Sequence, residues 1–142
     1  MADLAHEYAE ARRKGALVDL CGRAKWRLTG GDRVRYLNGQ VTNDVRKATE
    51  GSAMAACVTT AKGRLCGVVY VSAGKDFLRL DAEGELREGL GARLERYIIA
   101  DDAALEDVTE QECLYHVLAS EPPEIEAVVR MAARYSLSPP VP

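Results

Sequence analysis

Short apolar or alternating segments follow one another along the chain, and each predicts a helix or a strand. Residues 3–14 are rich in alanine behind a capping aspartate, which predicts a helix that ends at the following glycine. Residues 16–20 are a short, mainly apolar run that predicts a strand. Residues 24–29 alternate polar and apolar side chains, which predicts a half-buried strand with Trp26 and Leu28 facing the core.

The centre of the chain predicts a short helix followed by an antiparallel meander. The helix begins at Asp32 and is broken by Asn38 and Gly39, and Thr42 or Asn43 can cap a further helical turn. Three runs of strand-forming residues come next, at residues 53–60, 64–72 and 77–80. Because only short turns separate these runs, each strand is expected to pair with its sequence neighbour.

The last part of the chain predicts one long helix, two strands and a final helix. An apolar stripe marks the long helix over residues 84–98, and its members are Leu86, Leu90, Leu94, Tyr97 and Ile98. The later elements are strands at 105–108 and 113–118, a helix that opens at Pro122, and a flexible proline-rich tail at 136–142. Since strands cluster and helices fall between the clusters, residues 1–142 are predicted to form a single α+β domain with a mostly antiparallel sheet and packed helices.

Composition and charge narrow the class of partner. The 142 residues are 47% hydrophobic and 29% charged, as in ordinary globular domains. No apolar run reaches the ~20 residues of a membrane helix and the N-terminus has no apolar signal segment, so a cytoplasmic protein without a membrane partner is expected. Within a net charge of −3, basic residues gather in the first half and acidic residues in the second. A basic half can attract an anionic ligand and an acidic half disfavours nucleic acid, although solvated faces that meet in the fold are the plainer explanation.

The cysteines and histidines predict neither a metal site nor a nucleophilic pair. Cys21, Cys57, Cys66 and Cys113 form no C-x-x-C motif, and the chain has only two histidines. We therefore expect four reduced cysteines in or near the core, and no bound metal. Cys113 and His116 are three residues apart on one predicted strand, which directs their side chains to opposite faces.

Recognised catalytic loops are absent from the sequence, and no catalytic residue is assigned. There is no G-x-G-x-x-G behind a strand, no G-x-x-x-x-G-K-[ST] phosphate loop and no G-x-S-x-G elbow. Polar clusters remain as candidates. Thr42, Asn43 and Asp44 could contact a ligand or cap local backbone groups. Lys62 and Arg64, at the tip of a predicted hairpin, could meet a carboxylate or phosphate or simply face water.

Two further features have both a functional and a structural explanation. Asp101 and Asp102 could share a proton and act as an acid and a base, but the prediction for such a pair is that it caps a turn. Trp26 could stack on a planar ligand, but its alternation with Leu28 favours packing in the core.

Several separated motifs of the chain occur together in one order. They are Gly22–Gly30, Asp32–Val45, Thr59–Leu65, Arg96–Asp102 and Leu105–Val108. In this order they resemble the folate-binding aminomethyltransferases, a family that includes the glycine-cleavage T-protein and relatives that help to maintain iron–sulfur proteins. The resemblance spans about residues 15–118 and implies a tetrahydrofolate-binding fold. It also implies similarity to only the N-terminal part of these longer proteins, because their later pterin-gripping and cysteine-containing motifs have no counterpart here.

On this resemblance and the basic first half, six polar residues are candidates for contacts with tetrahydrofolate or a derivative: Thr42, Asn43, Asp44, Lys62, Arg64 and Asp81. An aspartate or asparagine could read the amino-pyrimidine edge of a pterin by paired hydrogen bonds, since that edge offers donors beside an acceptor. Lys62 or Arg64 could meet the glutamyl carboxylates.

The chain also departs from the pattern of the enzymes. Gly67 and Val68 stand where the enzymes carry an aspartate pair, Ala55 stands where they often carry an aromatic residue, and Asp81 replaces an asparagine. The side chain of Val68 can neither ionise nor hydrogen-bond, so it cannot do the electrostatic work of an aspartate at a folate nitrogen. Aminomethyl transfer by this chain alone is therefore not expected.

Three functions are consistent with these observations. The first is a tetrahydrofolate-binding module without complete catalytic machinery. The second is one half of a split or truncated aminomethyltransferase, with the other half supplied by a partner chain. The third is a non-enzymatic interaction module that keeps the fold without a ligand, which Ala55 and Val68 favour. Pairing of two copies as a homodimer could also rebuild a two-domain surface.

Overall fold

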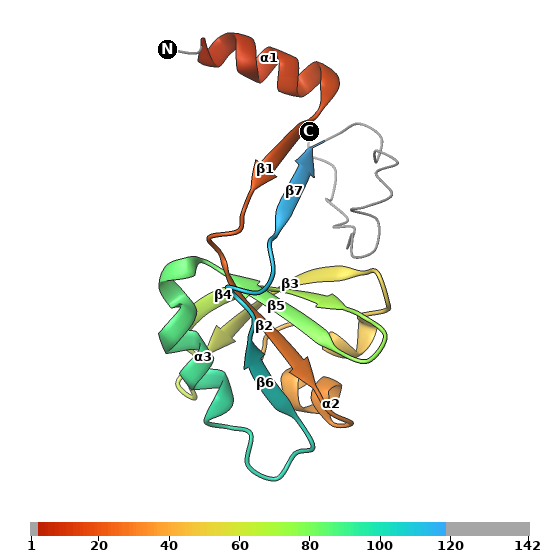
Figure 1. Ribbon diagram of the computed structural model, residues 1–142. Helices are drawn as coiled ribbons and strands as arrows, with labels where there is room; N and C mark the ends of the chain where they lie inside the picture. Colours follow the sequence, from red (N-terminus) through yellow and green to blue (C-terminus); the bar gives the residue numbers. More distant parts are fainter. Residues whose placement is uncertain (1–2, 119–142) are drawn as a thin grey trace, which may run out of the picture.

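The computed structural model describes residues 3–118, which form a curved antiparallel sheet, two packed helices and a projecting two-stranded ribbon (Figure 1). In chain order the elements are α1 (Leu4–Lys14), β1 (Ala16–Asp19), β2 (Ala24–Thr29), α2 (Arg33–Asn38), the 3-10 turn η1 (Val45–Lys47), β3 (Ala53–Thr59), β4 (Leu65–Ala73), β5 (Leu78–Ala82), the 3-10 turn η2 (Gly84–Leu86), α3 (Arg87–Glu95), β6 (Ala104–Asp107) and β7 (Tyr115–Leu118). The predicted α+β class with a mostly antiparallel sheet is confirmed. The predicted last helix from Pro122 and the tail at 136–142 lie outside the described residues.

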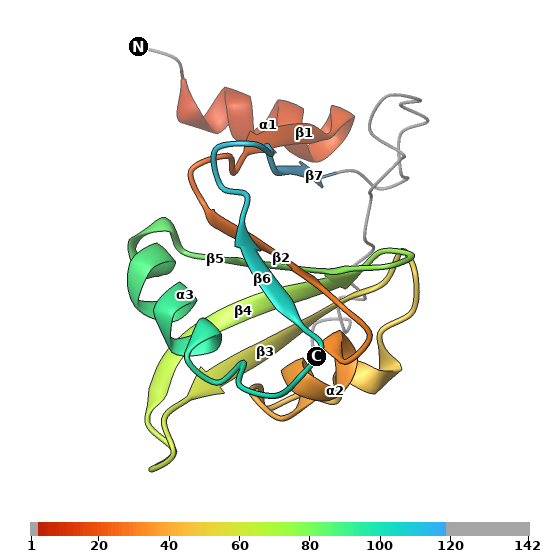
Figure 2. The same cartoon turned by 60° about the horizontal axis from the view of Figure 1, so that its bottom comes forward.

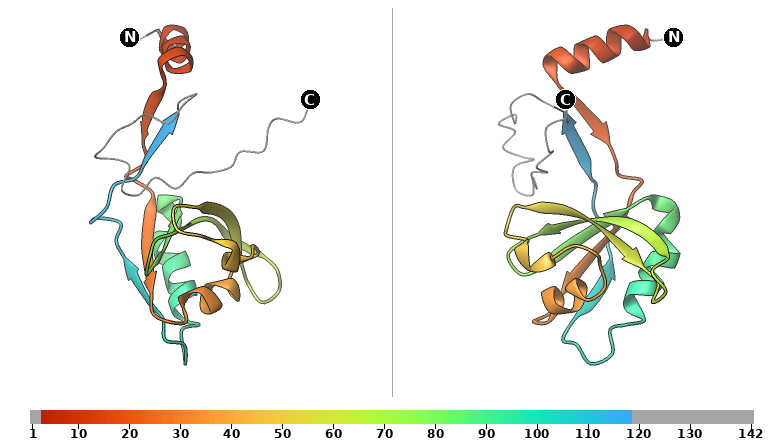
Figure 3. Two further views of the ribbon diagram at one scale, coloured as in Figure 1. Left: turned by 90° about the vertical axis from the view of Figure 1, so that its right-hand side faces the viewer. Right: turned by 180° about the vertical axis from the view of Figure 1, so that it is seen from behind.

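The main sheet has five strands in the order β3-β4-β5-β2-β6. Strands β3, β4 and β5 form the predicted meander, and β2 then pairs with both β5 and β6, so that every neighbouring pair is antiparallel. In this register Val71, Leu80 and Trp26 lie side by side across three strands. The sheet curves around α2 and α3, which lie on its inner side (Figures 2 and 3).

The core fills the space between the inner face of the sheet and the two helices. Trp26 and Leu28 are buried there, as their alternation predicts, together with Tyr36 and Leu37 of α2 and with residues of α3. The helix predicted over 84–98 begins instead as a 3-10 turn, and its α-helical part ends at Glu95. The predicted helix was therefore too long. After Leu94 the backbone forms 3-10 hydrogen bonds, from Tyr97 to Leu94 and from Ile98 to Glu95, and Tyr97 is left exposed.

The N-terminal helix and the ribbon stand apart from this core. The Asp3 side chain accepts a hydrogen bond from the Ala5 amide at 3.1 Å, and α1 ends at Gly15, so the predicted capping is confirmed. Helix α1 nevertheless buries no residue, and Leu4 remains 81% exposed. The chain continues into β1, which pairs with β7 in a two-stranded ribbon that projects from the sheet (Figure 1). None of the described helices is long and apolar enough to cross a membrane.

The four cysteines are free, but their burial differs from the prediction. Cys21, Cys57 and Cys66 are partly buried, whereas Cys113 is exposed, so its predicted place in or near the core is wrong. The reason is that β7 begins only at Tyr115, which leaves Cys113 in the connection that leads to the ribbon.

Two loops distant in sequence are joined by the predicted capping aspartates. The Asp32 amide donates to the carbonyl oxygen of Asp102 at 2.9 Å, and the Asp102 amide donates to the Asp32 carboxylate at 2.9 Å. The Asp102 carboxylate accepts from the Gly31 amide at 2.8 Å, and Asp101 pairs with Arg35 at 2.7 Å. The expectation that the acidic pair has a structural role at a turn is confirmed.

This junction predicts that Gly30 cannot be replaced by alanine without loss of stability. Gly30 has a φ of +102°, and a Cβ there would lie 2.2 Å from the carbonyl oxygen of Asp102. Gly63 has a φ of +76° with nothing within 4 Å of an added Cβ, and serves as the matched control. We expect Gly30→Ala to lower the free energy of unfolding in urea by about 1–3 kcal/mol more than Gly63→Ala, because only Gly30 adds a steric overlap to the strained φ. Equal losses would contradict this explanation.

Candidate functional site

The outer face of the sheet carries the polar side chains of its central strands. It is termed the open face and comprises Lys25, Arg27, Ala55, Cys57, Val68, Tyr70, Ser72, Arg79 and Asp81, which alternate with the core residues. Ala55, Tyr70, Asp81 and Lys25 lie in one row across β3, β4, β5 and β2. Side chains in such a row are close neighbours and can act on one ligand.

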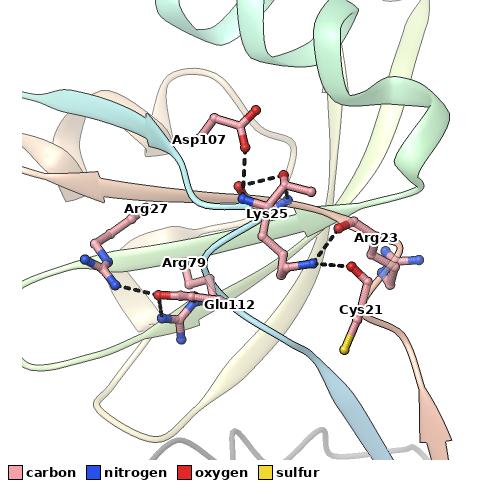
Figure 4. Close-up of polar contacts among 8 residues, drawn as sticks. Cys21, Arg23, Lys25, Arg27, Arg79, Asp107 and Glu112 are labelled. Atoms are coloured by element: carbon pink, nitrogen blue, oxygen red, sulfur yellow. Dashed lines mark hydrogen bonds and ion pairs between the residues drawn. The ribbon is translucent and has the colours of Figure 1, made fainter.

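Part of the open face is covered by the segment that follows β6. Lys25 is only 1% exposed, and its ammonium group donates to the carbonyl oxygens of Cys21 at 2.6 Å and Arg23 at 2.7 Å (Figure 4). The carboxylate of Glu112 binds both Arg27 and Arg79, the latter at 2.6 Å. These cations are thus engaged by the protein itself, and Arg27 and Arg79 fasten the covering segment to the sheet.

The uncovered part of the open face ends in a hollow of about 510 Å³. Its lining residues are Arg23, Leu65, Cys66, Gly67, Val68, Tyr70, Glu83 and Leu86. One wall is ionic, whereas Leu65 and Val68 form an apolar rim and are 62% and 40% exposed. The hollow is open to solvent and has both polar and apolar walls.

An ion cluster of Arg23, Glu83 and Asp81 borders the hollow, and Arg23 and Glu83 line it directly. Arg23 donates from Nε to the Asp81 carboxylate at 2.6 Å, and its Nη1 binds Glu83. The guanidinium carbon of Arg23 also lies 5.3 Å from the centroid of the Tyr70 ring, within the range of a cation–π contact. An aromatic face, a buried carboxylate and a shared cation therefore meet at one place.

Burial sets the protonation behaviour of this cluster. Burial raises the pKa of Asp81 above its ordinary value of 3.8, and the nearby Arg23 offsets only part of this effect. Burial also works against the charge of Arg23, but Asp81 and Glu83 outweigh it and raise the pKa of the guanidinium group. Asp81 is therefore a carboxylate that is costly to keep ionised, whereas Arg23 is always charged.

The three predicted site residues of the first cluster all bind backbone groups, two of them at the edge of β3 and one at η1. Thr42 Oγ1 accepts from the Cys57 amide at 2.9 Å, and Asn43 Nδ2 donates to the carbonyl oxygen of Ala55 at 2.9 Å. Asp44 accepts from the Arg46 amide and so caps η1. The expected cap, Thr42 or Asn43, was therefore wrong, because both of those side chains are engaged by β3. The cluster therefore bonds to backbone groups, which is the structural role that the sequence allowed as the alternative to ligand binding.

The remaining predicted site residues lie in two other places. Lys62 and Arg64 are exposed at the tip of the β3–β4 hairpin, and Asp81 lies in the ion cluster of the hollow. Thr42 lines a second, smaller hollow of about 280 Å³ with Arg93 and Tyr97, whose guanidinium and ring are 4.2 Å apart. The structure thus does not bring all six candidates together.

Three of the four positions at which the sequence departs from the family pattern, Ala55, Val68 and Asp81, lie on the open face. Ala55 and Asp81 flank Tyr70 in one row, and Val68 lies two residues before Tyr70 on the same strand. Gly67 has the opposite orientation, because a Cβ there would lie 2.8 Å from Leu86 Cδ1. Sequence reasoning missed Arg23 and Tyr70, which only the pairing of β4, β5 and β2 places beside Asp81.

Comparisons with known proteins support the fold. The protein-family models and the curated proteins contain no match to this chain. A solved structure, the glycine cleavage system aminomethyltransferase T from Bartonella henselae, is similar with a TM-score of 0.63 at 12% sequence identity. The similarity covers 75% of this chain and 29% of the aminomethyltransferase. At this identity the likeness concerns the fold alone, and the described domain has an aminomethyltransferase-like α+β fold.

The buried carboxylate of the ion cluster predicts a pH-dependent stability. Because the pKa of Asp81 is raised in the folded state, its favourable contribution is complete below the unfolded value of 3.8 and is lost as the pH rises through the folded value. Because asparagine cannot ionise, the Asp81→Asn variant should not lose stability in this way. The free energy of unfolding of the variant minus that of the native chain is therefore expected to increase as the pH rises above 3.8 through the folded pKa of Asp81. Urea unfolding at a series of pH values measures the effect.

Glu83→Gln is the matched control for this experiment. It removes the other carboxylate that binds Arg23, but the Glu83 side chain is 73% exposed. Exposed ion pairs contribute little, so a change below about 1 kcal/mol is expected. A stability difference between Asp81→Asn and the native chain that falls with rising pH would contradict the raised pKa.

Proposed function

We propose that this chain is a tetrahydrofolate-binding module without complete catalytic machinery, and that the hollow of the open face holds the pterin. The observation that carries the proposal is a hollow of about 510 Å³ that is lined by Tyr70 and Arg23, with the buried Asp81 bonded to Arg23. The aminomethyltransferase-like fold supports the same ligand class.

The chemistry of the ion cluster suits the amino-pyrimidine edge of a pterin. That edge presents hydrogen-bond donors beside an acceptor, which a carboxylate and a guanidinium group can match together. Asp81 is held in place by Arg23, whereas the exposed Glu83 can leave Arg23 at little cost and turn to a ligand. The ring of Tyr70 offers an aromatic face on which a planar pterin can stack.

The exposed cations of the hairpin tip suit the other end of the ligand. Arg64 directly precedes Leu65, which lines the hollow, and Lys62 lies on the same tip. A folate extends from its pterin to glutamyl carboxylates, and an arginine or lysine can bind such groups. In this arrangement Thr42, Asn43 and Asp44 support the neighbouring edge strand and contact no pterin.

A second candidate function is docking of a partner that supplies the missing part of a longer assembly. Leu65 and Val68 expose an apolar rim beside the ionic wall, and such patches are typical of interaction surfaces. The chain spans 29% of the aminomethyltransferase T that it resembles. A second-half chain or a second copy could cover this rim, and aminomethyl transfer would require groups from that partner.

Titration calorimetry with 5-formyltetrahydrofolate tests the binding proposal. Saturable binding with a micromolar Kd, or about −8 kcal/mol, is expected. Tyr70→Leu is expected to weaken binding about tenfold, since loss of aromatic stacking costs about 1–3 kcal/mol. Tyr97→Leu is the matched control, because Tyr97 lines the second hollow. No saturable heat from the native chain would refute folate binding, and a loss confined to Tyr97→Leu would move the ligand to the second hollow.

A gain of affinity provides an independent test at the rim. Val68 is partly exposed beside Tyr70 and stands at a position where the resemblance places an aspartate in the enzymes. Val68→Asp adds a carboxylate that can accept hydrogen bonds from the pterin, so we expect Kd to fall about five- to tenfold. Leu65→Asp adds the same charge at the outer rim and should leave Kd within about twofold. Equal effects of the two changes would argue against a pterin beside Tyr70.

A further inference from the structure

Two cysteines distant in sequence lie opposite each other where the ribbon joins the sheet. Asp19 of β1 pairs with Tyr115 of β7, and the Leu20 amide donates to the carbonyl oxygen of Leu114 at 2.9 Å. Cys21 and Cys113 follow directly beyond this pairing, and their side chains contact each other. In agreement, Cys21 Sγ lies 3.8 Å from the carbonyl oxygen of Leu114, the residue next to Cys113.

The backbone on both sides of this pair is anchored. The Lys25 ammonium group holds the carbonyl oxygen of Cys21 at 2.6 Å, and Arg27 and Arg79 hold Glu112, which directly precedes Cys113. Directly opposite residues of antiparallel strands have Cα atoms about 4.5–5.5 Å apart. This range falls within the Cα separations that a disulfide bridges, so little backbone movement is needed.

We propose that Cys21 and Cys113 form a reversible disulfide when the protein meets a low-molecular-weight disulfide such as oxidised glutathione. The inference rests on the geometry of the ribbon and is independent of folate binding. Residues 21 and 113 are 92 positions apart in the sequence, and the bond would fasten the two connections that carry the ribbon and α1 (Figure 1).

The order of the two steps follows from exposure and protonation. Cys113 is exposed, whereas Asp19 and Cys113 raise the pKa of Cys21 to about 11. The Cys113 thiolate therefore attacks first, breaks the S–S bond of oxidised glutathione and releases one glutathione thiolate, which takes a proton from water. Cys21 then loses its proton to water, attacks the Cys113 sulfur and releases the second glutathione. Two protein thiols are oxidised and one glutathione disulfide is reduced to two thiols.

The other two cysteines provide an internal control. Cys57 of β3 pairs in register with Val68, and Cys66 lies elsewhere on β4, so the two are not opposite each other. Both are partly buried like Cys21, but neither has a cysteine as its strand partner. The proposed reaction should therefore persist when both Cys57 and Cys66 are replaced by serine.

The test is incubation of the full chain with oxidised glutathione at about pH 8, followed by intact mass and peptide mapping without reductant. We expect the Cys57→Ser, Cys66→Ser double variant to lose two hydrogen atoms in mass and to yield one cross-linked peptide containing Cys21 and Cys113. Cys21→Ser should stop at a glutathione adduct on Cys113. The oxidised double variant should melt about 10 °C higher than its reduced form, because a bond across a long loop restricts the unfolded chain.

Three results would overturn the proposal. They are an unchanged mass after incubation, glutathione adducts on both cysteines without a cross-link, and a cross-link that forms only between different molecules. The last is recognised by a doubled mass that Cys21→Ser does not abolish. Since folding is followed by the same melting curves, a variant that fails to fold is identified, and Cys21→Ala and Cys113→Ala then repeat the comparison.

Discussion

The binding of Glu112 by Arg27 and Arg79 determines which part of the sheet is open and which is closed. Both arginines project from the outer face of neighbouring strands, where their register alone would place two like charges side by side. Glu112 neutralises this pair and holds the segment after β6 against the sheet, and its pKa is lowered because the two arginines outweigh its burial. The Lys25 ammonium group is buried beside this pair of strands and donates to the carbonyl oxygens of Cys21 and Arg23. This clamp joins the segment that leads into β7 to the main sheet.

The clamp also explains why the hollow lies where it does. Beyond Lys25 no segment of residues 3–118 is clamped to the outer face in the same way, so Tyr70, Arg23 and Glu83 border an accessible space. Arg23 connects the covered and the uncovered parts of the open face, because its carbonyl oxygen accepts a hydrogen bond from Lys25 while its guanidinium group binds Asp81. One residue thus contacts both the ion cluster and the buried Lys25. The same Lys25 ammonium group also donates to the carbonyl oxygen of Cys21, two positions before Arg23.

Local patterns predicted the elements well, whereas the site depended on contacts that no local pattern contains. Alternation in residues 24–29 identified the inward Trp26, and the short turns identified the meander, because both depend on neighbouring residues. The burial of Lys25 could not be anticipated, since the segment that covers it lies more than 80 residues away. For the same reason Tyr70 and Arg23 were missed. Thr42 and Asn43 were named as site candidates because they are polar, but the sequence could not show that their side chains bond to β3.

The arrangement around Asp81 favours binding over catalysis on physical grounds. A general base must be free to take a proton and must lie close to the reacting atom. Asp81 instead shares its charge with Arg23, which always remains protonated, and Val68 adds no ionisable group at the rim. A carboxylate fixed by a guanidinium group is well suited to orient hydrogen-bond donors of a ligand, because its geometry is held before the ligand arrives. Under the proposed function, chemistry at a bound pterin would therefore need a group from outside this domain, placed over the apolar rim of Leu65 and Val68.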